Sequence, residues 1–352
     1  NTIPIVAFFL HPFMNFLYPT DIFPFADLIF EHWAYLPSYG FFLCAVIIGE
    51  TLFKNADLRK TILAVWVAVL VTLTWSRAAL WQDPVALMQD TVKKSPQKAR
   101  VHNNLGLILW EQGRTEEAKS SFQTAIQLDP GYVLANNNLA SLFLKENKFS
   151  EARELLEKAI AKAPHYLDLY VNLGYAYEGM NNFPEAAGYF NFVIQRGGQN
   201  SAAYVGMGNI LQKTGRLVEA KEYFQKAIWL RPENASAHYN LGNVHFAEKN
   251  FYQALVDYDK ALKLDPKIAG AYINSGNIYF YFQDNKSAVE MYQKAIAADP
   301  DSAEAYLNLA NALHADGKTE ESWAAAEKAL TLYAAEGNNK RAAEIRKALS
   351  GT

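Results

Sequence analysis

The sequence contains few of the residues from which disulfide-linked, nucleic-acid-binding or catalytic proteins are built. Its 352 residues include a single cysteine, Cys44, so no disulfide can form within the chain and the thiol content indicates no redox compartment. The formal net charge is only −3, and the basic stripe that marks nucleic-acid binding is absent. No phosphate-binding glycine-rich loop, nucleophile elbow or HExxH motif occurs. The sequence therefore predicts no nucleic-acid partner and no catalytic residue.

Metal and cofactor chemistry has equally little support. The seven histidines are scattered, and no two of them have the spacing that places metal ligands on one face of a helix. We predict no metal site and no cofactor. His102, His238 and His245 are interpreted as packing residues.

Charged residues are sparse in residues 1–81, where long apolar runs occur instead. Two runs, residues 35–53 and 61–80, approach the ~20 residues that cross the hydrocarbon core of a bilayer. Residues 3–19 are a third span or a re-entrant piece, since His11 and Pro12 interrupt them. We predict a transmembrane region over residues 1–81 and a junction helix over residues 82–98. For any single run, the alternative is a buried helix of a soluble domain.

The short loop between the two runs predicts their orientation. Residues 54–60 hold Lys54, Arg59 and Lys60 against one acid, Asp57, and an excess of basic residues favours the cytoplasmic side. Everything after residue 80 is then extracytoplasmic: in the periplasm, at the cell exterior or in the ER lumen. The start at Asn1, without a methionine or a basic leader, is interpreted as a cut edge with further segments upstream; a processed mature terminus is the alternative.

A period of 34 residues governs the rest of the chain. One series consists of prolines, with Gly198 in the place of the missing member: Pro96, Pro130, Pro164, Pro232, Pro266 and Pro300. A second series has small residues: Gly106, Ala140, Gly174, Gly208, Gly242, Gly276 and Ala310. A third has large apolar residues: Phe122, Leu156, Phe190, Phe224, Tyr258 and Tyr292. Small residues allow two helices to approach, the large residue fills the space beside them, and proline ends the unit.

These series resemble the tetratricopeptide repeat, a pair of antiparallel helices. The resemblance implies seven repeats over residues 99–336 and a C-terminal cap helix over residues 337–352, which an open solenoid end requires. The predicted fold class is therefore all-α: transmembrane helices followed by a right-handed solenoid of tetratricopeptide repeats.

Asparagine recurs on the face that each first helix would turn toward the concave groove. Two columns, three residues apart and thus side by side on a helix, make up the predicted peptide-binding groove: Asn104, Asn138, Asn172, Asn240, Asn274 and Asn308, with Asn209, Asn243, Asn277 and Asn311. Apolar packing does not require an amide, whereas an amide offers the donor and acceptor that a peptide backbone needs. The alternative is that these amides join helix to helix or cap neighbouring carbonyls.

A segment near the start resembles a second family. In residues 30–43, Glu31, Tyr35, Leu36, Pro37, Ser38 and Gly40 match a stretch of the type-C glycosyltransferases that carry tetratricopeptide tails. These are the transmembrane-and-tetratricopeptide protein O-mannosyltransferases and their bacterial relatives, which have arginine in the place of His32. The resemblance implies a lipid-phosphate sugar donor, with Glu31 and His32 as its contacts. The acidic catalytic loop of the family does not occur in this sequence.

Two functions follow from these observations. The first is a membrane-anchored scaffold that binds a protein segment in its groove, in contact with membrane lipid and with neighbouring membrane subunits of a larger assembly. The second is the C-terminal part of a membrane protein O-glycosyltransferase. Asn234 and Asn285 fit the N-glycosylation pattern, which matters only in a secretory pathway.

Overall fold

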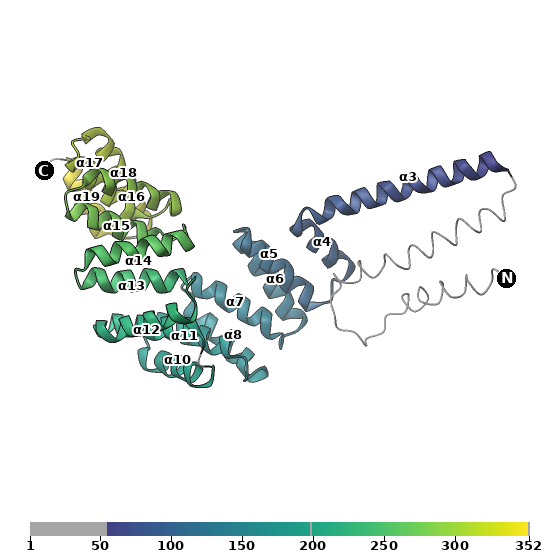
Figure 1. Ribbon diagram of the computed structural model, residues 1–352, viewed down its shortest axis with the longest axis horizontal. Coiled ribbons are helices and arrows are strands. Elements are labelled where there is room, and N and C mark those ends of the chain that lie inside the picture. Colours follow the sequence, from purple (N-terminus) through teal and green to yellow (C-terminus); the bar gives the residue numbers. More distant parts are fainter. Residues whose placement is uncertain (1–54, 198, 351–352) are drawn as a thin grey trace. The chain divides into compact units, whose positions relative to one another are not determined.

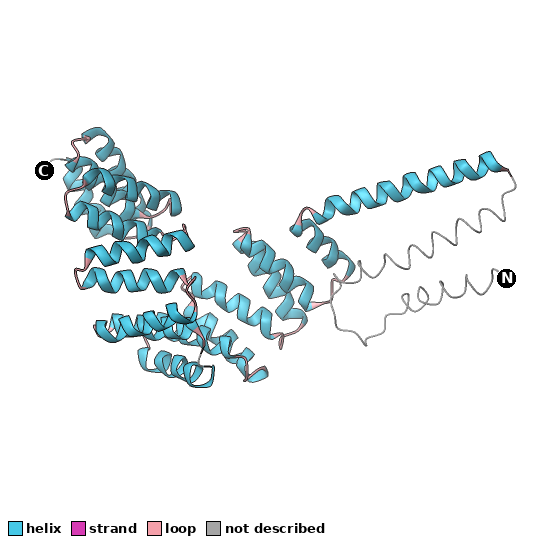
Figure 2. Cartoon of the chain, in the orientation of Figure 1, coloured by secondary structure: helices cyan, strands magenta, loops and turns pink. Residues whose placement is uncertain are grey.

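The computed structural model describes residues 55–197 and 199–350 of the chain. In this part the chain forms seventeen helices, α3 to α19, and no strand (Figures 1 and 2). Consecutive helices are joined by short turns, so neighbours run antiparallel as in helical repeats. The prediction of an all-α protein built of tetratricopeptide repeats is confirmed.

The predicted transmembrane part of the fold is wrong for the residues that the structure describes. None of the helices in the described ranges combines the length and the apolar character that a bilayer crossing needs. Residues 61–80, predicted as a span, lie in α3 (Ala56–Trp81), which is 26 residues long. Its run without a polar or charged side chain covers only residues 62–71, well short of ~20, because Asp57, Lys60 and the segment Thr72–Arg77 flank it. The spans predicted at 35–53 and 3–19, and the residues Glu31 and His32, lie outside the described residues.

The chain divides into two compact units, residues Asn1–Ala135 and Asn136–Thr352, which are described separately. In the first unit, α4 (Pro84–Lys94) packs on α5 (Ala99–Glu111), which packs closely on α6 (Thr115–Leu128). Asp83 accepts hydrogen bonds from the backbone N–H groups of Val85 and Ala86 and so caps α4. The pair α5–α6 is the first repeat, and its small residue Gly106 lies against the ring of Phe122.

The second unit is a stack of helix pairs followed by a single terminal helix. Repeats two to seven are α7 (Val133–Lys145) with α8 (Phe149–Lys162), α9 (Leu167–Gly179) with α10 (Phe183–Gly197), α11 (Ser201–Lys213) with α12 (Leu217–Leu230), α13 (Ala235–Ala247) with α14 (Phe251–Leu264), α15 (Ala269–Tyr281) with α16 (Asn285–Ala298), and α17 (Ala303–Ala315) with α18 (Thr319–Ala335). The last helix is α19 (Asn339–Ser350), which packs on α18 and buries Ala342 and Ile345.

Local chemistry explains both kinds of turn. Inside each repeat, the residue that reverses the chain has a positive φ, which glycine adopts at Gly113, Gly215 and Gly317 without strain. Asparagine, lysine or glutamine takes this place elsewhere, at Asn147, Asn181, Lys249 and Gln283. In three of the turns between repeats an aspartate precedes the proline and accepts from a backbone N–H two residues later, as Asp265 does from Lys267 at 3.0 Å.

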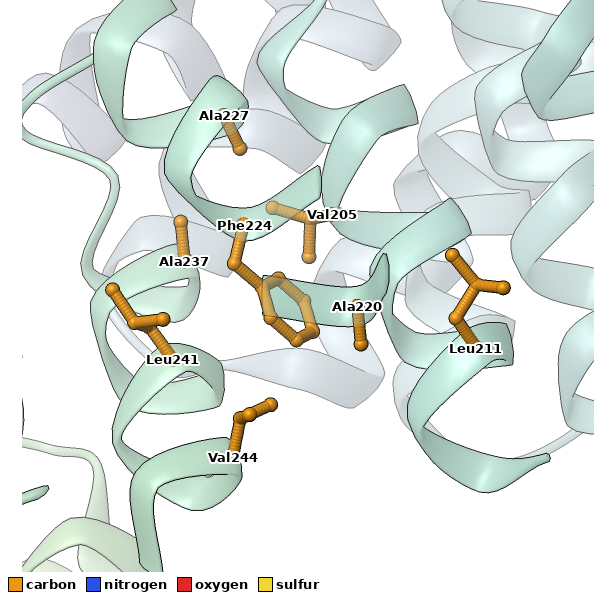
Figure 3. Packing of buried hydrophobic residues seen from close by; sticks show 8 residues of the cluster. All are labelled: Val205, Leu211, Ala220, Phe224, Ala227, Ala237, Leu241 and Val244. Atoms are coloured by element: carbon orange, nitrogen blue, oxygen red, sulfur yellow. The ribbon is translucent and has the colours of Figure 1, made fainter. Parts of the chain in front are cut away.

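A small residue facing a ring forms the centre of most repeats. A Cβ at Gly208 would lie 2.5 Å from the ring of Phe224, so the two helices of repeat four can meet only without it. Figure 3 shows the Phe224 ring among apolar side chains from α11, α12 and α13, including Val205, Ala227 and Leu241. The same contact joins Gly174 to Phe190, Gly242 to Tyr258 and Gly276 to Tyr292. Where the small residue is alanine, as in Ala140 and Ala310, the facing position holds Leu156 or Ala326 instead of a ring.

First helices also contact the first helices of neighbouring repeats. This is the case for α9 with α11, α11 with α13, and α15 with α17. In a stack of helix pairs the elements that touch their equivalents in this way lie on the inner side of the curve. Some residues of each first helix are not buried against the second helix of the same repeat. These residues therefore line an inner face.

Candidate functional site: an amide ladder on the first helices

Asparagine side chains connect successive first helices in the second unit. In repeats three, five, six and seven the Nδ2 group of one residue donates to a side-chain oxygen of the preceding repeat. The pairs are Asn172 to Ser141 (3.2 Å), Asn240 to Asn209 (2.9 Å), Asn274 to Asn243 (2.9 Å) and Asn308 to Asn277 (3.2 Å). Asn172 also donates to Oδ1 of Asn137, at 2.8 Å. We call Asn172, Asn240, Asn274 and Asn308 the donor column, Ser141, Asn209, Asn243 and Asn277 the acceptor column, and the whole set the amide ladder.

The ladder is interrupted at repeat four for a steric reason. Gly206 occupies the donor position there, and a Cβ at this place would lie 2.3 Å from the ring of Phe190. Other bonds join repeats three and four instead. The hydroxyl of Tyr175 donates to the carbonyl of Ala202 at 2.8 Å, and Lys213 bonds the nearly buried carboxylate of Glu178 at 2.8 Å.

Tyrosine hydroxyls reinforce the acceptor column in repeats five and six. Tyr258 donates to Oδ1 of Asn243 at 2.9 Å, and Tyr292 donates to Oδ1 of Asn277 at 2.7 Å. Burial raises the pKa of both tyrosines, so the hydroxyls stay protonated and remain donors. Each of these Asn oxygens therefore accepts two hydrogen bonds, and both amide planes are held in place.

The remaining predicted groove residues lie outside these pairs. Asn104 is half-buried on α5 in the first unit and accepts from Asn103 at 3.4 Å. Asn138 is half-buried on α7. Asn311 is exposed on α17, in the acceptor position of the last repeat.

The bonding pattern determines what the ladder can still offer a ligand. An amide has one acceptor oxygen and two donor hydrogens. In Asn243 and Asn277 the oxygen is used, which leaves the Nδ2 hydrogens; in Asn274 and Asn308 the Oδ1 oxygen is left. The alternative considered from the sequence, that the amides join helix to helix, therefore holds for these four pairs. Peptide binding by the same amides stays a prediction.

Aromatic side chains that the sequence analysis did not single out lie toward the ends of α13 and α15, two helices that carry ladder residues, and at the start of α14. Tyr281 and Phe282 are 67% and 62% exposed, and Phe280 is 38% exposed. Phe251 contacts the rings of Phe246, Tyr281 and Phe282 at centroid distances of 5.7, 5.0 and 5.7 Å. We call Phe246, Phe251, Phe280, Tyr281 and Phe282 the aromatic shelf. Four consecutive aromatic residues at 279–282, running into a turn, were the sequence signal that could have revealed it.

The histidines support repeat packing, as predicted. Ring nitrogens of His102 and His238 bond the carbonyls of Pro96 and Pro232 at 2.9 and 3.0 Å, and the Tyr170 hydroxyl donates to the carbonyl of Pro164. His245 is buried and bonds the buried Asp257 at 2.8 Å, joining α13 to α14.

An open pocket of about 440 Å³ lies beside the His245–Asp257 pair and is also lined by His238, Lys221 and Lys260. Among the described residues no three histidine, cysteine or acidic side chains are grouped as metal ligands. The pocket holds no serine, threonine or cysteine that His245 could activate as a nucleophile.

Comparisons with known proteins agree with this architecture. Sequence profiles described as tetratricopeptide or TPR repeat match residues 81–133, 109–158, 143–207, 208–249, 235–268, 276–317 and 303–336. Together they cover well over half of the chain. The protein belongs to the tetratricopeptide-repeat family.

Two curated relatives are protein O-mannosyl-transferases. The chain is 36% identical over 104 residues to F38B6.6 of Caenorhabditis elegans, which is 29% of this chain and 15% of that protein. It is 33% identical over 106 residues to Tmtc2 of Drosophila melanogaster, which is 28% of this chain and 11% of that protein. Both similarities lie in the repeats. The chain thus matches only a small part of the length of these relatives.

Solved structures share the fold at low sequence identity. Yeast Tom70 superimposes with a TM-score of 0.57 at 17% identity, covering 76% of this chain and 58% of that one. A tetratricopeptide repeat protein from Parabacteroides merdae superimposes with a TM-score of 0.56 at 18% identity, covering 68% and 94%. At these identities the likeness shows the fold alone.

Proposed function

We propose that the second unit is a scaffold that binds an extended polypeptide segment along its first helices, with the amide ladder contacting the backbone of that segment. The observation that carries this proposal is the pairing of the amides. Hydrogen bonds to neighbouring repeats hold each amide in one orientation, and each still has an unused donor or acceptor. A preorganised row of this kind loses little side-chain entropy when a ligand binds.

The spacing of the row suits a peptide backbone. Neighbouring first helices lie about 10 Å apart, and an extended chain rises about 3.3 Å per residue. The separation of two ladder amides therefore corresponds to about three residues of an extended ligand. Every residue of a peptide carries a backbone carbonyl, so such contacts need little sequence specificity.

The ladder allows a substitution that separates binding from stability. In Asn277→Asp, one carboxylate oxygen can still accept from Tyr292 and Asn308, whereas the Nδ2 donor is lost. In Asn308→Asp, the donor to Asn277 is lost and two oxygens face each other. We expect Asn277→Asp to weaken binding of an extended peptide about tenfold, equivalent to about 1.4 kcal/mol, with little change in Tm. Asn308→Asp should lower the Tm as well.

The measurement is fluorescence anisotropy with labelled, uncharged twelve-residue peptides, accompanied by thermal denaturation of each variant. Equal peptide affinity in the wild-type protein and in Asn277→Asp would remove the ladder from the binding site. A matched control is Asn285→Asp, which changes an asparagine at the start of α16, on a second helix.

A second candidate function has one specific observation in its favour. The two curated relatives are O-mannosyl-transferases, so we infer as an alternative that these repeats belong to a protein O-glycosyltransferase and lie on the extracytoplasmic side. Intact-mass measurement of the protein from its native source, with peptide mapping upstream of Asn1, tests this. An upstream region with an acidic loop supports the enzyme, and a native mass equal to that of the 352-residue chain counts against it.

A further inference from the structure

The first helices of repeats five and six carry no permanently charged side chain. Neither α13 nor α15 contains an aspartate, glutamate, lysine or arginine. The second helices of the same repeats are rich in charge: α14 has Asp257, Asp259, Lys260 and Lys263, and α16 has Lys286, Glu290 and Lys294. A charged ligand on the inner face of these repeats would lose its hydration without meeting an opposite charge. The complementary ligand is therefore uncharged.

Three residues of the aromatic shelf, Phe246, Phe280 and Tyr281, lie on these two uncharged helices. Phe246 follows Asn243 by three residues and Phe280 follows Asn277 by three, so each ring lies one turn from a ladder amide on the same side of its helix. Most of the surface of Tyr281 and Phe282 is exposed to solvent. The ring of Phe251 contacts the rings of both residues. Exposed rings that contact one another are held in place, so they lose little side-chain entropy when they bind a flat apolar group.

The spacing of the amides favours one backbone conformation. In polyproline II the chain makes one turn in three residues and rises about 9.3 Å per turn, close to the separation of about 10 Å between first helices. Every third carbonyl then points to the same side. In a β-strand, successive side chains and carbonyls alternate, so the third residue faces away. Asn243 and Asn277 offer only Nδ2 donors, which fits a chain whose prolines lack N–H groups.

We propose that repeats five and six bind an uncharged, proline-rich segment in the polyproline II conformation. Its carbonyls accept from Nδ2 of Asn243 and Asn277, and its prolyl rings lie on the aromatic shelf. This inference rests on the proposed function and specifies the partner of the same site. The partner chemistry follows from the uncharged helices, the donor-only amides and the exposed rings together.

The test compares two labelled twelve-residue probes by fluorescence anisotropy, up to about 1 mM protein. One probe is oligoproline with glycine ends, and the other is an uncharged Gly-Ser repeat of equal length. The full chain is used as wild type, as Asn277→Asp, as Phe280→Ala/Tyr281→Ala and as Tyr281→Ala alone. Trp229→Ala is the control, because Trp229 is 71% exposed on α12, a second helix. Circular dichroism establishes that each variant is folded.

We expect oligoproline to bind at least tenfold more tightly than Gly-Ser. Both shelf variants and Asn277→Asp should weaken oligoproline binding at least fivefold, and Trp229→Ala should not change it. Equal binding of both probes, dependent on Asn277, would overturn the proline-rich partner but leave the scaffold function intact. Oligoproline binding that the shelf variants do not alter would also overturn it. Failure of both probes to bind would overturn the scaffold function as well.

Discussion

The contact between Gly208 and Phe224 shows how closely single atoms determine the packing of a repeat. No side chain larger than hydrogen fits at residue 208 while the ring stays in place. The chain itself contains a second solution, since repeat two pairs Ala140 with Leu156. The size of one residue is thus coupled to the shape of the residue that faces it.

We expect Gly208→Ala to destabilise the protein by about 1–3 kcal/mol, because the added methyl group overpacks the core. Adding Phe224→Leu should recover part of this loss by recreating the pair of repeat two. Gly188→Ala is the control: nothing lies within 4 Å of a Cβ at residue 188 in α10, so alanine should add up to about 1 kcal/mol through helix propensity. Thermal and urea denaturation measure these changes. Similar Tm shifts for Gly208→Ala and Gly188→Ala would contradict the packing argument.

At the same scale, the sequence singled out the asparagines of the ladder but not Ser141, and it left open whether the amides bond to one another or to a ligand. The 34-residue period places Asn240 and Asn209 in neighbouring repeats, yet it does not say how far apart two helices lie. That distance is set by the small residues and rings of the core. Only at the observed separation does Nδ2 of Asn240 reach Oδ1 of Asn209, at 2.9 Å.

The two helices of a repeat can be joined by a buried polar contact or by an apolar one. Repeat five has a buried polar contact. His245 and Asp257 are both buried and hydrogen-bonded between α13 and α14. The equivalent places in repeat six hold Tyr279 and Met291. The same fold is therefore compatible with a polar pair or an apolar one.

We expect Asp257→Met to lower stability by about 1–3 kcal/mol, since it leaves a buried imidazole N–H without an acceptor. Replacing both residues, His245→Tyr with Asp257→Met, should restore most of the loss by installing the pair of repeat six. Denaturation of the wild type, both single variants and the double variant gives the coupling energy directly. Additive losses would show that the two side chains do not act as a pair.

The character of α3 and the exposure of the aromatic residues at the end of α15 were harder to predict than the helices that follow the 34-residue period. The composition of α3 suggested a membrane span, but polar residues on both sides leave its apolar run too short. The aromatic shelf was missed because aromatic residues in these repeats usually pack inward, as Tyr258 and Tyr292 do. Exposure depends on whether a further helix covers the end of α15, which a periodic pattern does not reveal.

The two N-glycosylation patterns have different structural roles in the whole molecule. Asn234 caps α13 through Ala237 and donates to Ser201 of the preceding repeat at 2.8 Å. Asn285 begins α16, one residue after its cap, Asp284. A glycan is therefore compatible with the folded second unit at Asn285 and would displace structural bonds at Asn234.

If the repeats lie on the extracytoplasmic side, as the second candidate function requires, we expect N-glycan at Asn285 and little or none at Asn234. Glycopeptide mass spectrometry of the protein expressed in eukaryotic cells measures both sites. Complete absence of glycan at Asn285 would argue against passage through the secretory pathway. Asn285→Gln serves as the control for assignment of the modified peptide.

Every bond of the amide ladder has the same sense, from a later repeat to the repeat before it. Asn308 donates to Asn277, Asn274 to Asn243, and Asn240 to Asn209. The amide dipoles therefore do not cancel but align along the stack, as peptide dipoles do along a helix. A ligand backbone has its own polarity, so its two possible orientations on the ladder differ in energy. For the segment that we propose as the ligand, we therefore expect one preferred N-to-C direction along the inner face.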